Sequence, residues 1–314
     1  MKKNKNKKIV VFGSTGMVGS SICRLLKKKK YRHVFHPQKK ELNLLNASQV
    51  DKYFKKIKPD LVIMPAGKVG GIMINNIKKY DFLYENLQMG TNVINYAFKN
   101  NIKDLIYFGS SCIYPKNTRL PIKEDSILSG KFEETNDAYA LAKVSIIKLC
   151  EYLNREFNTN YISLIPCNLY GPNDNYNLLT SHVLPALINK IHISKIQKTN
   201  SVTLWGDGRS KREFLYVDDL ASACEIIIKS GIKNNQKTIN IGSSKEITIK
   251  ELTLKIMKVL KHEVKIKFDK TKPNGVRSKK VNDKIIRQLG WKENISLERG
   301  IQLSYKNFLK NNNI

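Results

Sequence analysis

Three glycines near the N-terminus constrain this chain more than any other feature. Gly13, Gly16 and Gly19 follow the apolar run Lys8–Phe12 and precede the helical segment Ser20–Lys29. In a strand–turn–helix of this kind, backbone N–H groups and the helix N-terminus can bind a pyrophosphate. The pattern therefore predicts a dinucleotide-binding turn. We assign its cofactor contacts to Gly13, Ser14, Thr15, Gly16, Met17, Val18 and Gly19.

Short strand-like runs alternate with helical segments through the first half of the chain. The runs are Lys8–Phe12, His33–His36, Leu61–Met64, Leu105–Gly109 and Tyr161–Pro166. Such alternation favours a parallel sheet with helices on both faces. We predict an α/β fold with a Rossmann-type, doubly wound parallel sheet and a smaller C-terminal α/β substrate lobe.

The pattern loosens after Tyr176 into short mixed elements. These are Val202–Trp205, Thr238–Ile241, a helix at Ile249–Leu260, a basic stretch at Lys265–Lys280 and a last helix at Ser296–Leu309. We therefore expect residues 1–175 to form the nucleotide-binding domain, with some later segments returning to it. Residues 176–314 should form mainly the substrate lobe.

The end of the second predicted strand bears on the choice of cofactor. An NAD enzyme usually places Asp or Glu there to bind the ribose 2′-hydroxyl, whereas this chain reads His36-Pro-Gln-Lys-Lys40. The missing carboxylate favours NADPH. Lys39 and Lys40 either face the 2′-phosphate or are ordinary solvated charges. Ala66, just after the third predicted strand, is a further candidate contact.

Tyr139 and Lys143 are the strongest catalytic candidates. They are four residues apart on a predicted helix and so share a face, and no other tyrosine in the chain has a lysine at this spacing. An ammonium beside a phenol stabilises the phenolate, and this makes tyrosine a usable acid or base near neutral pH. Ser110, after the fourth predicted strand, can position a carbonyl between them.

The net charge of +30 raises the question of a polyanionic partner. Such a surface attracts nucleic acid nonspecifically. However, the lysines are scattered through the whole chain, and no basic region is interleaved with stacking aromatic residues. We expect no specific nucleic-acid partner, and a non-enzymatic basic binding protein is only a remote alternative.

The cysteines and the apolar runs bear on the compartment. The chain has five cysteines, an odd number, and no CxxC pair. This usage is typical of free thiols in a reducing cytoplasm, and we predict neither a metal site nor disulfides. No apolar run approaches the length of about 18 residues that a membrane span needs, so we expect no membrane association.

Several motifs together resemble a known family. The sequence is similar, over almost its whole length, to the extended short-chain dehydrogenase/reductases and, within them, to the GDP-L-fucose synthase group. The motifs are Gly16-Met-Val-Gly19, Lys68-Val-Gly-Gly-Ile72, Ser110-Ser-Cys-Ile-Tyr-Pro115, Asn168-Leu-Tyr-Gly-Pro172, Ser181-His-Val183, Arg212-Glu-Phe-Leu215 and Val217-Asp-Asp219.

The resemblance implies an activity and a set of roles. The expected activity is the NADPH-dependent reduction of carbon 4, with epimerisation at carbons 3 and 5, of a GDP-linked 4-keto-6-deoxy sugar for surface glycans such as capsule or lipopolysaccharide. Ser110, Tyr139 and Lys143 would serve hydride transfer. Cys112 and His182 would exchange protons on the sugar. Tyr139, Lys143 and His182 would also contact the cofactor. The substrate contacts would be Ser111, Asn168, Lys190, Trp205, Arg212 and Lys279.

The resemblance also implies a homodimer. Relatives of this type pair through a four-helix bundle, and here the helices near Leu83–Phe98 and Ala138–Leu153 carry apolar stripes.

Some positions depart from the family pattern. Ser14-Thr15 stands where His-Arg is common, Cys167 where threonine is usual, and Arg277-Ser-Lys279 where Pro-Arg-Lys is usual. A carbon-4 reductase without epimerase activity, acting on a related GDP-4-keto-6-deoxy-heptose, therefore stays open as the alternative.

Overall fold

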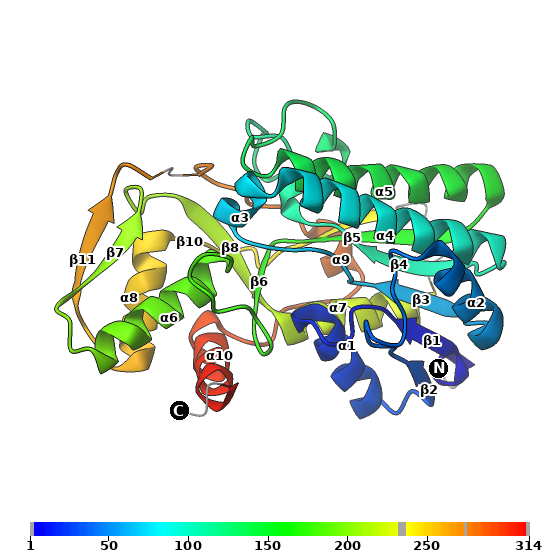
Figure 1. Ribbon diagram of the computed structural model, residues 1–314, viewed down its shortest axis with the longest axis horizontal. Coiled ribbons are helices and arrows are strands. Elements are labelled where there is room, and N and C mark those ends of the chain that lie inside the picture. Colours follow the sequence, from blue (N-terminus) through cyan, green and yellow to red (C-terminus); the bar gives the residue numbers. More distant parts are fainter. Residues whose placement is uncertain (1–2, 232–236, 273–274, 312–314) are drawn as a thin grey trace.

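The computed structural model describes residues 3–231, 237–272 and 275–311. A six-stranded parallel sheet with the order β2-β1-β3-β4-β5-β9 forms its centre (Figure 1). The strands are β1 (Lys8–Val11), β2 (His33–Phe35), β3 (Leu61–Met64), β4 (Asp104–Phe108), β5 (Asn160–Pro166) and β9 (Thr238–Ile241). The predicted Rossmann-type parallel sheet is confirmed, and the first five predicted strands agree with the observed ones to within one residue at each end.

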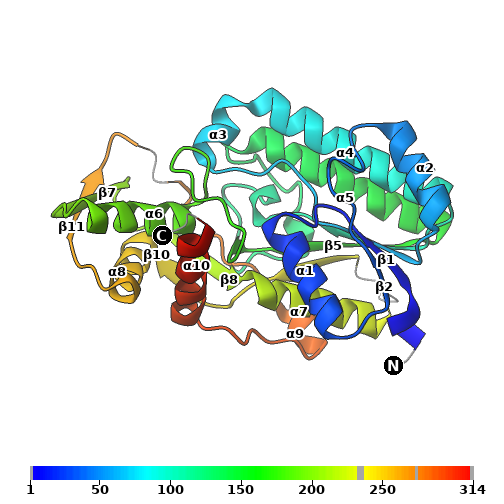
Figure 2. The ribbon, with the colours of Figure 1, turned by 60° about the horizontal axis from the view of Figure 1, so that its bottom comes forward.

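Helices cover both faces of this sheet. All residues of β3 and β9 are buried, as is usual for strands with helices on either side. Figure 2 shows α2, α4 and α5 on one face and α1 and α7 on the other. These helices are α1 (Met17–Lys28), α2 (Ala47–Ile57), α4 (Lys79–Lys99), α5 (Asp137–Phe157) and α7 (Val217–Ser230); the short α3 (Ile72–Ile77) precedes α4.

A second lobe lies beyond the carboxyl end of the sheet (Figure 1). It contains a three-stranded sheet in the order β10-β8-β6, a parallel pair β11-β7, and its own apolar core. Its elements are β6 (Asn168–Tyr170), α6 (Val183–Ile196), β7 (Ser201–Trp205), β8 (Lys211–Tyr216), β10 (Glu246–Thr248), α8 (Ile249–Leu260), β11 (Lys265–Asp269) and α10 (Leu297–Asn311).

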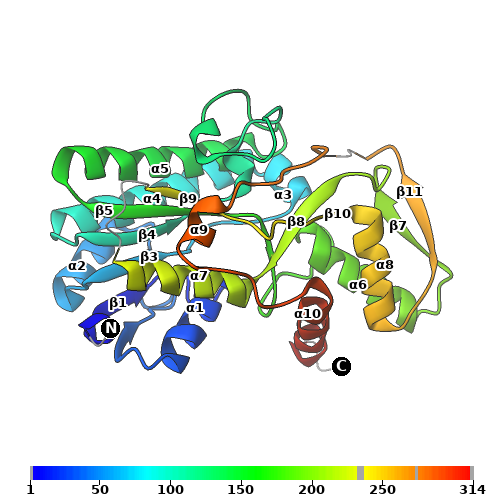
Figure 3. The same cartoon turned by 180° about the vertical axis from the view of Figure 1, so that it is seen from behind.

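Some later segments of the chain pack on the central sheet or pair with it. The run Thr238–Ile241, which the sequence grouped with the elements of the second lobe, is the edge strand β9 and pairs with β5. Helix α7 packs against α1. Figure 3 shows the chain after β11 running back from the second lobe to α9 (Lys284–Gln288), which contacts β9. The two lobes are therefore interleaved along the chain: β6, α6, β7 and β8 of the second lobe precede β9, whereas β10, α8, β11 and α10 follow it.

The start of one predicted helix shows a local sequence signal. The predicted helix Ile249–Leu260 coincides with α8, which starts at a capping box between Thr248 and Glu251.

Three short 3-10 turns complete the described elements: η1 (Lys3–Asn6), η2 (Ser111–Ile113) and η3 (Glu124–Ser126). None of the described helices is both long and apolar enough to cross a membrane.

Candidate active site

The glycine turn between β1 and α1 has the predicted geometry. Gly13 has a φ of +70°, where a side chain is strained, and a Cβ there would lie 2.8 Å from the Cα of Ala66. A Cβ on Gly19 would overlap the carbonyl oxygen of Gly13. Gly13 therefore permits the turn, and Gly19 permits α1 to pack on it. Gly16 is the N-cap of α1, so the positive end of the helix points at the turn.

Ser14 connects the glycine turn to the end of β2. Its hydroxyl donates to the carbonyl oxygen of His36 at 3.2 Å. Beyond His36, the carbonyl of Gln38 accepts the N–H groups of Glu41 and Leu42, and this turn leaves Lys39 and Lys40 exposed. The Glu41 carboxylate accepts from the Gln38 N–H at 2.8 Å, so the nearest acid in sequence is used to close the turn.

Helix α5 holds Tyr139 and Lys143 on its buried face. Tyr139 is 6% exposed and Lys143 is 3% exposed. The Lys143 ammonium donates to the carbonyl oxygen of Phe108, the last residue of β4, at 2.9 Å, and lies 5.7 Å from the centre of the Tyr139 ring. A Cβ on Gly67 would lie 3.3 Å from this ammonium, so the loop after β3 passes beside it.

The pKa of Tyr139 does not follow the prediction. The sequence argument expected Lys143 to lower it, whereas burial, with a smaller contribution from Cys112, raises the pKa of Tyr139 above its ordinary value. Burial also lowers the pKa of Lys143 to about 8. Loss of hydration, which disfavours the charged phenolate, is the largest cause of the raised pKa of Tyr139. A tyrosine in this state keeps its proton and is poised as an acid.

Ser110, Ser111 and Cys112 lie in the turn that follows β4. The Ser110 hydroxyl accepts from the Cys112 N–H at 3.3 Å and caps the short helix η2. Ser111 is buried, and Cys112 is half-buried. Cys112 interacts electrostatically with both Tyr139 and Arg212. The fold therefore brings Ser110, Cys112, Tyr139 and Lys143 to the carboxyl end of β4.

His182 reaches the same region through the loop after β3. It is the N-cap residue of α6, and its side chain makes no capping hydrogen bond and is open to solvent. Surrounding protein atoms nevertheless lower its pKa through loss of hydration. The preceding Thr180 accepts the Gly71 N–H at 2.8 Å. A Cβ on the adjacent Gly70 would contact Phe82, whose ring packs edge-on against Tyr139 at 6.3 Å.

Arg212 lies at the junction of the two lobes. Its Nη1 donates to the carbonyl oxygens of Lys211 at 2.7 Å and Val276 at 2.6 Å. Val276 belongs to residues 275–281, called here the return strap, which is hydrogen-bonded to β8 at Lys211 and Glu213. Lys279 is half-buried in this strap. Burial lowers the pKa of Arg212, but a guanidinium stays charged in proteins.

Glu213 and Asn168 make hydrogen bonds to backbone groups at this junction. Glu213 is fully buried, and its carboxylate accepts from the N–H groups of Ser243 at 3.2 Å and Val281 at 2.8 Å. Burial raises the pKa of Glu213 to about 7. The Asn168 amide donates to the carbonyl oxygen of Glu213 at 3.0 Å. Part of the hydrogen-bonding capacity predicted for the sugar is therefore used to hold the backbone of β8.

Lys190 and Trp205 meet in the second lobe. The Lys190 ammonium donates to the carbonyl oxygen of Thr203 at 3.0 Å and lies 5.7 Å from the centre of the Trp205 ring. Trp205 is 39% exposed. The two residues form a cation–aromatic pair on the surface of the second lobe. They are brought together as one patch, separate from the buried Tyr139 and Lys143.

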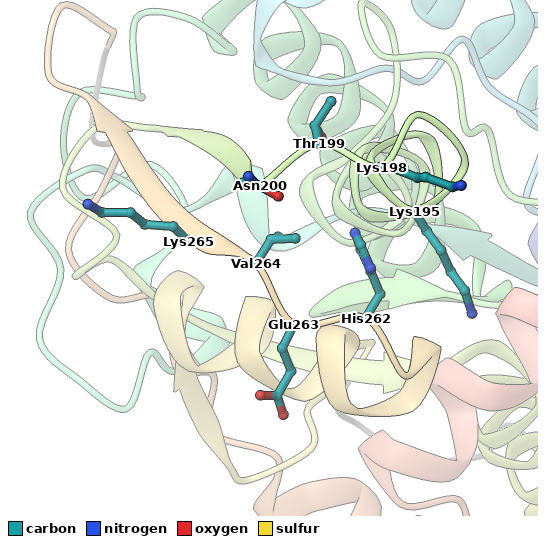
Figure 4. Close-up of a pocket in the computed structure, with 8 residues that line it drawn as sticks. All are labelled: Lys195, Lys198, Thr199, Asn200, His262, Glu263, Val264 and Lys265. Atoms are coloured by element: carbon teal, nitrogen blue, oxygen red, sulfur yellow. The ribbon is translucent and has the colours of Figure 1, made fainter.

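A hollow of about 670 Å³ lies at the far end of the second lobe (Figure 4). Its walls come from the end of α6, the loop between α6 and β7, the segment between α8 and β11, and the first residue of β11. The lining residues are Lys195, Lys198, Thr199, Asn200, His262, Glu263, Val264 and Lys265. None of the predicted site residues lines it. A smaller hollow nearby, about 230 Å³, includes Lys190 and Thr203.

Sequence reasoning missed the residues that hold the loop after β3. Asn86 on α4 accepts the Lys68 N–H at 2.9 Å and donates to the carbonyl oxygens of Lys68 and Phe82. The Lys68 ammonium pairs with Glu85 and Asp81 of the same helix. A polar side chain on the buried face of α4 is the signal that identifies Asn86. It fixes the loop that passes between Lys143 and the segment before His182.

The chain is similar in sequence to known proteins. The sequence model described as the NAD dependent epimerase/dehydratase family matches residues 9–242. GDP-L-fucose synthase from Escherichia coli (strain K12) is 40% identical over 311 residues, which cover 97% of each chain.

Two solved structures from Campylobacter jejuni are also similar. A GDP-6-OMe-4-keto-L-xylo-heptose reductase is 31% identical with a TM-score of 0.90, covering 98% of this chain and 99% of that one. A GDP-mannoheptose C4 reductase with NADP bound is 31% identical with a TM-score of 0.87, covering 97% and 98%.

Proposed function

Because the chain belongs to the NAD dependent epimerase/dehydratase family, we propose that it epimerises carbons 3 and 5 and reduces carbon 4 of a GDP-linked 4-keto-6-deoxy sugar, using NADPH. The observation that carries this proposal is the buried pair Tyr139 and Lys143, set at the end of β4 beside Ser110 and Cys112. The relative of 40% identity, named GDP-L-fucose synthase, supports the same activity.

The residues around the glycine turn fit a dinucleotide. Gly13 and Gly19 remove the side chains that would fill the space between the turn, Ala66 and α1. The positive end of α1 faces the place where a pyrophosphate would lie. Lys39 and Lys40, with no free carboxylate at the end of β2, suit the 2′-phosphate of NADPH. The C4 reductase relative with NADP bound supports the same cofactor.

Reduction at carbon 4 requires a proton and a stabilised oxygen. When bound, NADPH supplies the hydride to carbon 4. Tyr139 holds its proton because burial raises its pKa, and it donates that proton to the oxygen as negative charge develops there. The Ser110 hydroxyl donates a second hydrogen bond. Lys143, fixed by the Phe108 carbonyl, supplies positive charge beneath the tyrosine.

Epimerisation uses the same oxygen. A proton on carbon 3 or 5 is acidified by the neighbouring ketone, because the resulting carbanion delocalises onto the oxygen that Tyr139 and Ser110 stabilise. Inverting the carbon requires a base on one face and an acid on the other. Cys112 and His182 are suited to these roles because thiols and imidazoles exchange protons near neutral pH.

The nucleotide end of the substrate is proposed to lie along the second lobe. Arg212 suits the diphosphate, with Lys279 of the return strap and Lys190 as further cations. Trp205, beside Lys190, offers an exposed ring to the nucleoside. Ser111 and Asn168 are proposed to contact the sugar. Product identification by NMR, after incubation with NADPH and candidate GDP-4-keto sugars, tests the whole proposal; no conversion of any of them would overturn it.

One observation favours a second candidate function. The similar Campylobacter jejuni structures are named heptose reductases, and one is named a C4 reductase. A carbon-4 reductase without epimerase activity, acting on a GDP-linked heptose, would use the same Ser110, Tyr139 and Lys143. Solvent deuterium separates the two, because only epimerisation exchanges carbon-bound protons.

Removing the charges of Lys39 and Lys40 should change the cofactor preference. The double variant Lys39→Ala/Lys40→Ala should weaken NADPH binding by about ten-fold or more, since charge-assisted contacts to the 2′-phosphate are lost, and should leave NADH binding unchanged. Fluorescence titration measures both. The exposed pair Lys27→Ala/Lys28→Ala is the matched control for lost surface charge. Equal weakening of both cofactors would contradict the assignment.

The outer faces of α4 and α5 support a homodimer. Large apolar side chains are exposed there, including Tyr84 at 49%, Tyr152 at 48% and Phe157 at 48%. We expect light scattering at micromolar concentration to give twice the chain mass. Tyr152→Asp should produce monomers, because it buries a charge in the interface. Phe268→Asp in the second lobe should leave the mass unchanged; a monomeric wild-type protein would contradict the pairing.

The cysteines support a cytoplasmic location. All five are free, and Cys150, Cys167 and Cys224 are buried. Unpaired thiols are typical of a reducing compartment. GDP-linked sugars made there would serve the synthesis of surface glycans.

A further inference from the structure

Asn75 on the short helix α3 is buried although its side chain is polar. It is 4% exposed, and its Nδ2 donates to the carbonyl oxygens of Gly70 at 2.6 Å and Gly71 at 3.0 Å. Buried amides are costly unless they are hydrogen-bonded. The two bonds therefore hold the Gly70-Gly71 backbone in one conformation against the start of α3.

The Gly70-Gly71 backbone in turn contacts the segment before His182. The Gly71 N–H donates to the Thr180 carbonyl at 2.8 Å, and a Cβ on Gly71 would overlap the Ser181 carbonyl oxygen. Residue 71 must therefore be glycine for the two backbones to approach this closely. The next residue after Ser181 is His182, the N-cap of α6.

Two buried polar groups beside this contact make no hydrogen bond in the part of the chain that the structure describes. The Oδ1 atom of Asn75 and the hydroxyl of Ser181 are both buried without a hydrogen-bond partner. The Nδ2 bonds of Asn75 and the bond from Gly71 to Thr180 therefore link the segment before His182 to the loop after β3.

From this geometry we propose that Asn75, acting through Gly71, is the residue that positions His182 against the sugar. The inference rests on the proposed function, because it assigns His182 a proton-exchange role. Asn75 itself touches no reacting atom. On the other side of this loop, a Cβ on Gly70 would lie 3.1 Å from the ring of Phe82, which packs edge-on against Tyr139, so the loop passes between Tyr139 and the segment before His182.

Asn75→Ala should release this segment without touching the hydride-transfer residues. A misplacement of a reacting group by about 1 Å typically costs on the order of 10²-fold. The rate of proton exchange at carbons 3 and 5 should therefore fall by about that factor. Deuterium incorporation into the product measures this rate. The reduction of an already epimerised ketone should remain unchanged, because Ser110, Tyr139 and Lys143 are not altered. Gly71→Ala disturbs the same contact from the other side and should reproduce this split.

A second measurement does not depend on turnover. The chain has five histidines, so ring nitrogen spectra can resolve His182. Surrounding protein lowers the pKa of His182, and in both variants it should move back towards its ordinary value while the other four histidines are unchanged. Asn76→Ala, at the exposed neighbour on the same helix, is the matched control and should change nothing.

Two results overturn the inference. One is a His182 titration that is identical in wild type, Asn75→Ala and Gly71→Ala. The other is a loss of exchange, reduction and NADPH affinity together, which would show a general structural role. If wild type shows no exchange at all, the proposed epimerisation fails, and the His182 titration still decides whether Asn75 positions the ring.

Discussion

Replacing Tyr139 with Phe should lower the rate of ketone reduction by about 10²- to 10⁴-fold, the usual contribution of one general acid. The substitution removes the hydroxyl that donates to the carbon-4 oxygen and leaves the ring packed against Phe82. Gly13, Gly16 and Gly19 are untouched, so NADPH binding should be nearly unchanged. Stopped-flow absorbance of NADPH with a pre-epimerised GDP-4-keto sugar measures the chemical step directly.

The pH dependence adds a second readout for the same residue. Because burial raises the pKa of Tyr139, its protonated form persists through neutral pH, so wild-type reduction should not be lost through ionisation of the tyrosine there. Tyr161→Phe is the matched control. It also removes a buried phenol hydroxyl, which donates to the Ile102 carbonyl, but it lies away from the site. Near-normal turnover of Tyr139→Phe would remove this residue from the mechanism.

The parts of the molecule that the sequence predicted are those that local chemistry determines. The glycine turn is readable because Gly13 needs a positive φ and Gly19 needs a missing side chain, and both requirements act within seven residues of chain. Tyr139 and Lys143 are readable because one helix turn separates them. Helix α8 was predicted at Ile249–Leu260, its observed bounds, and the structure shows a local capping box at its start.

The parts that sequence reasoning missed depend on contacts between distant segments. Strand β9 was grouped with the second lobe, because only its pairing with β5 shows that it closes the central sheet. The raised pKa of Tyr139 follows from burial by several elements, and helical spacing alone carries no information about that burial. Asn75 and Asn86 hold loops through backbone carbonyls, so their sequence signal is only a polar residue on a buried face.

Cys112→Ser should suppress proton exchange on the sugar while sparing reduction. A serine hydroxyl is far less ionised than a thiol, so it is a much weaker base. During turnover of a GDP-4-keto-6-deoxy sugar in deuterated water, the wild-type protein should place deuterium at carbon 3 or 5, because the abstracted proton exchanges with solvent. In the variant, incorporation should fall by about 10²-fold or more, the range for one acid–base group.

Loss of proton exchange with normal ketone reduction would be a result specific to Cys112. Ser110, Tyr139 and Lys143 remain in the variant, so reduction of an already epimerised ketone should continue at the wild-type rate. Cys23→Ser is the matched control, because Cys23 is also half-buried but lies on α1. If the wild-type protein reduces its substrate with no deuterium at either carbon, the bifunctional proposal fails. Cys112 and His182 would then orient the sugar, and the protein would act as a carbon-4 reductase alone.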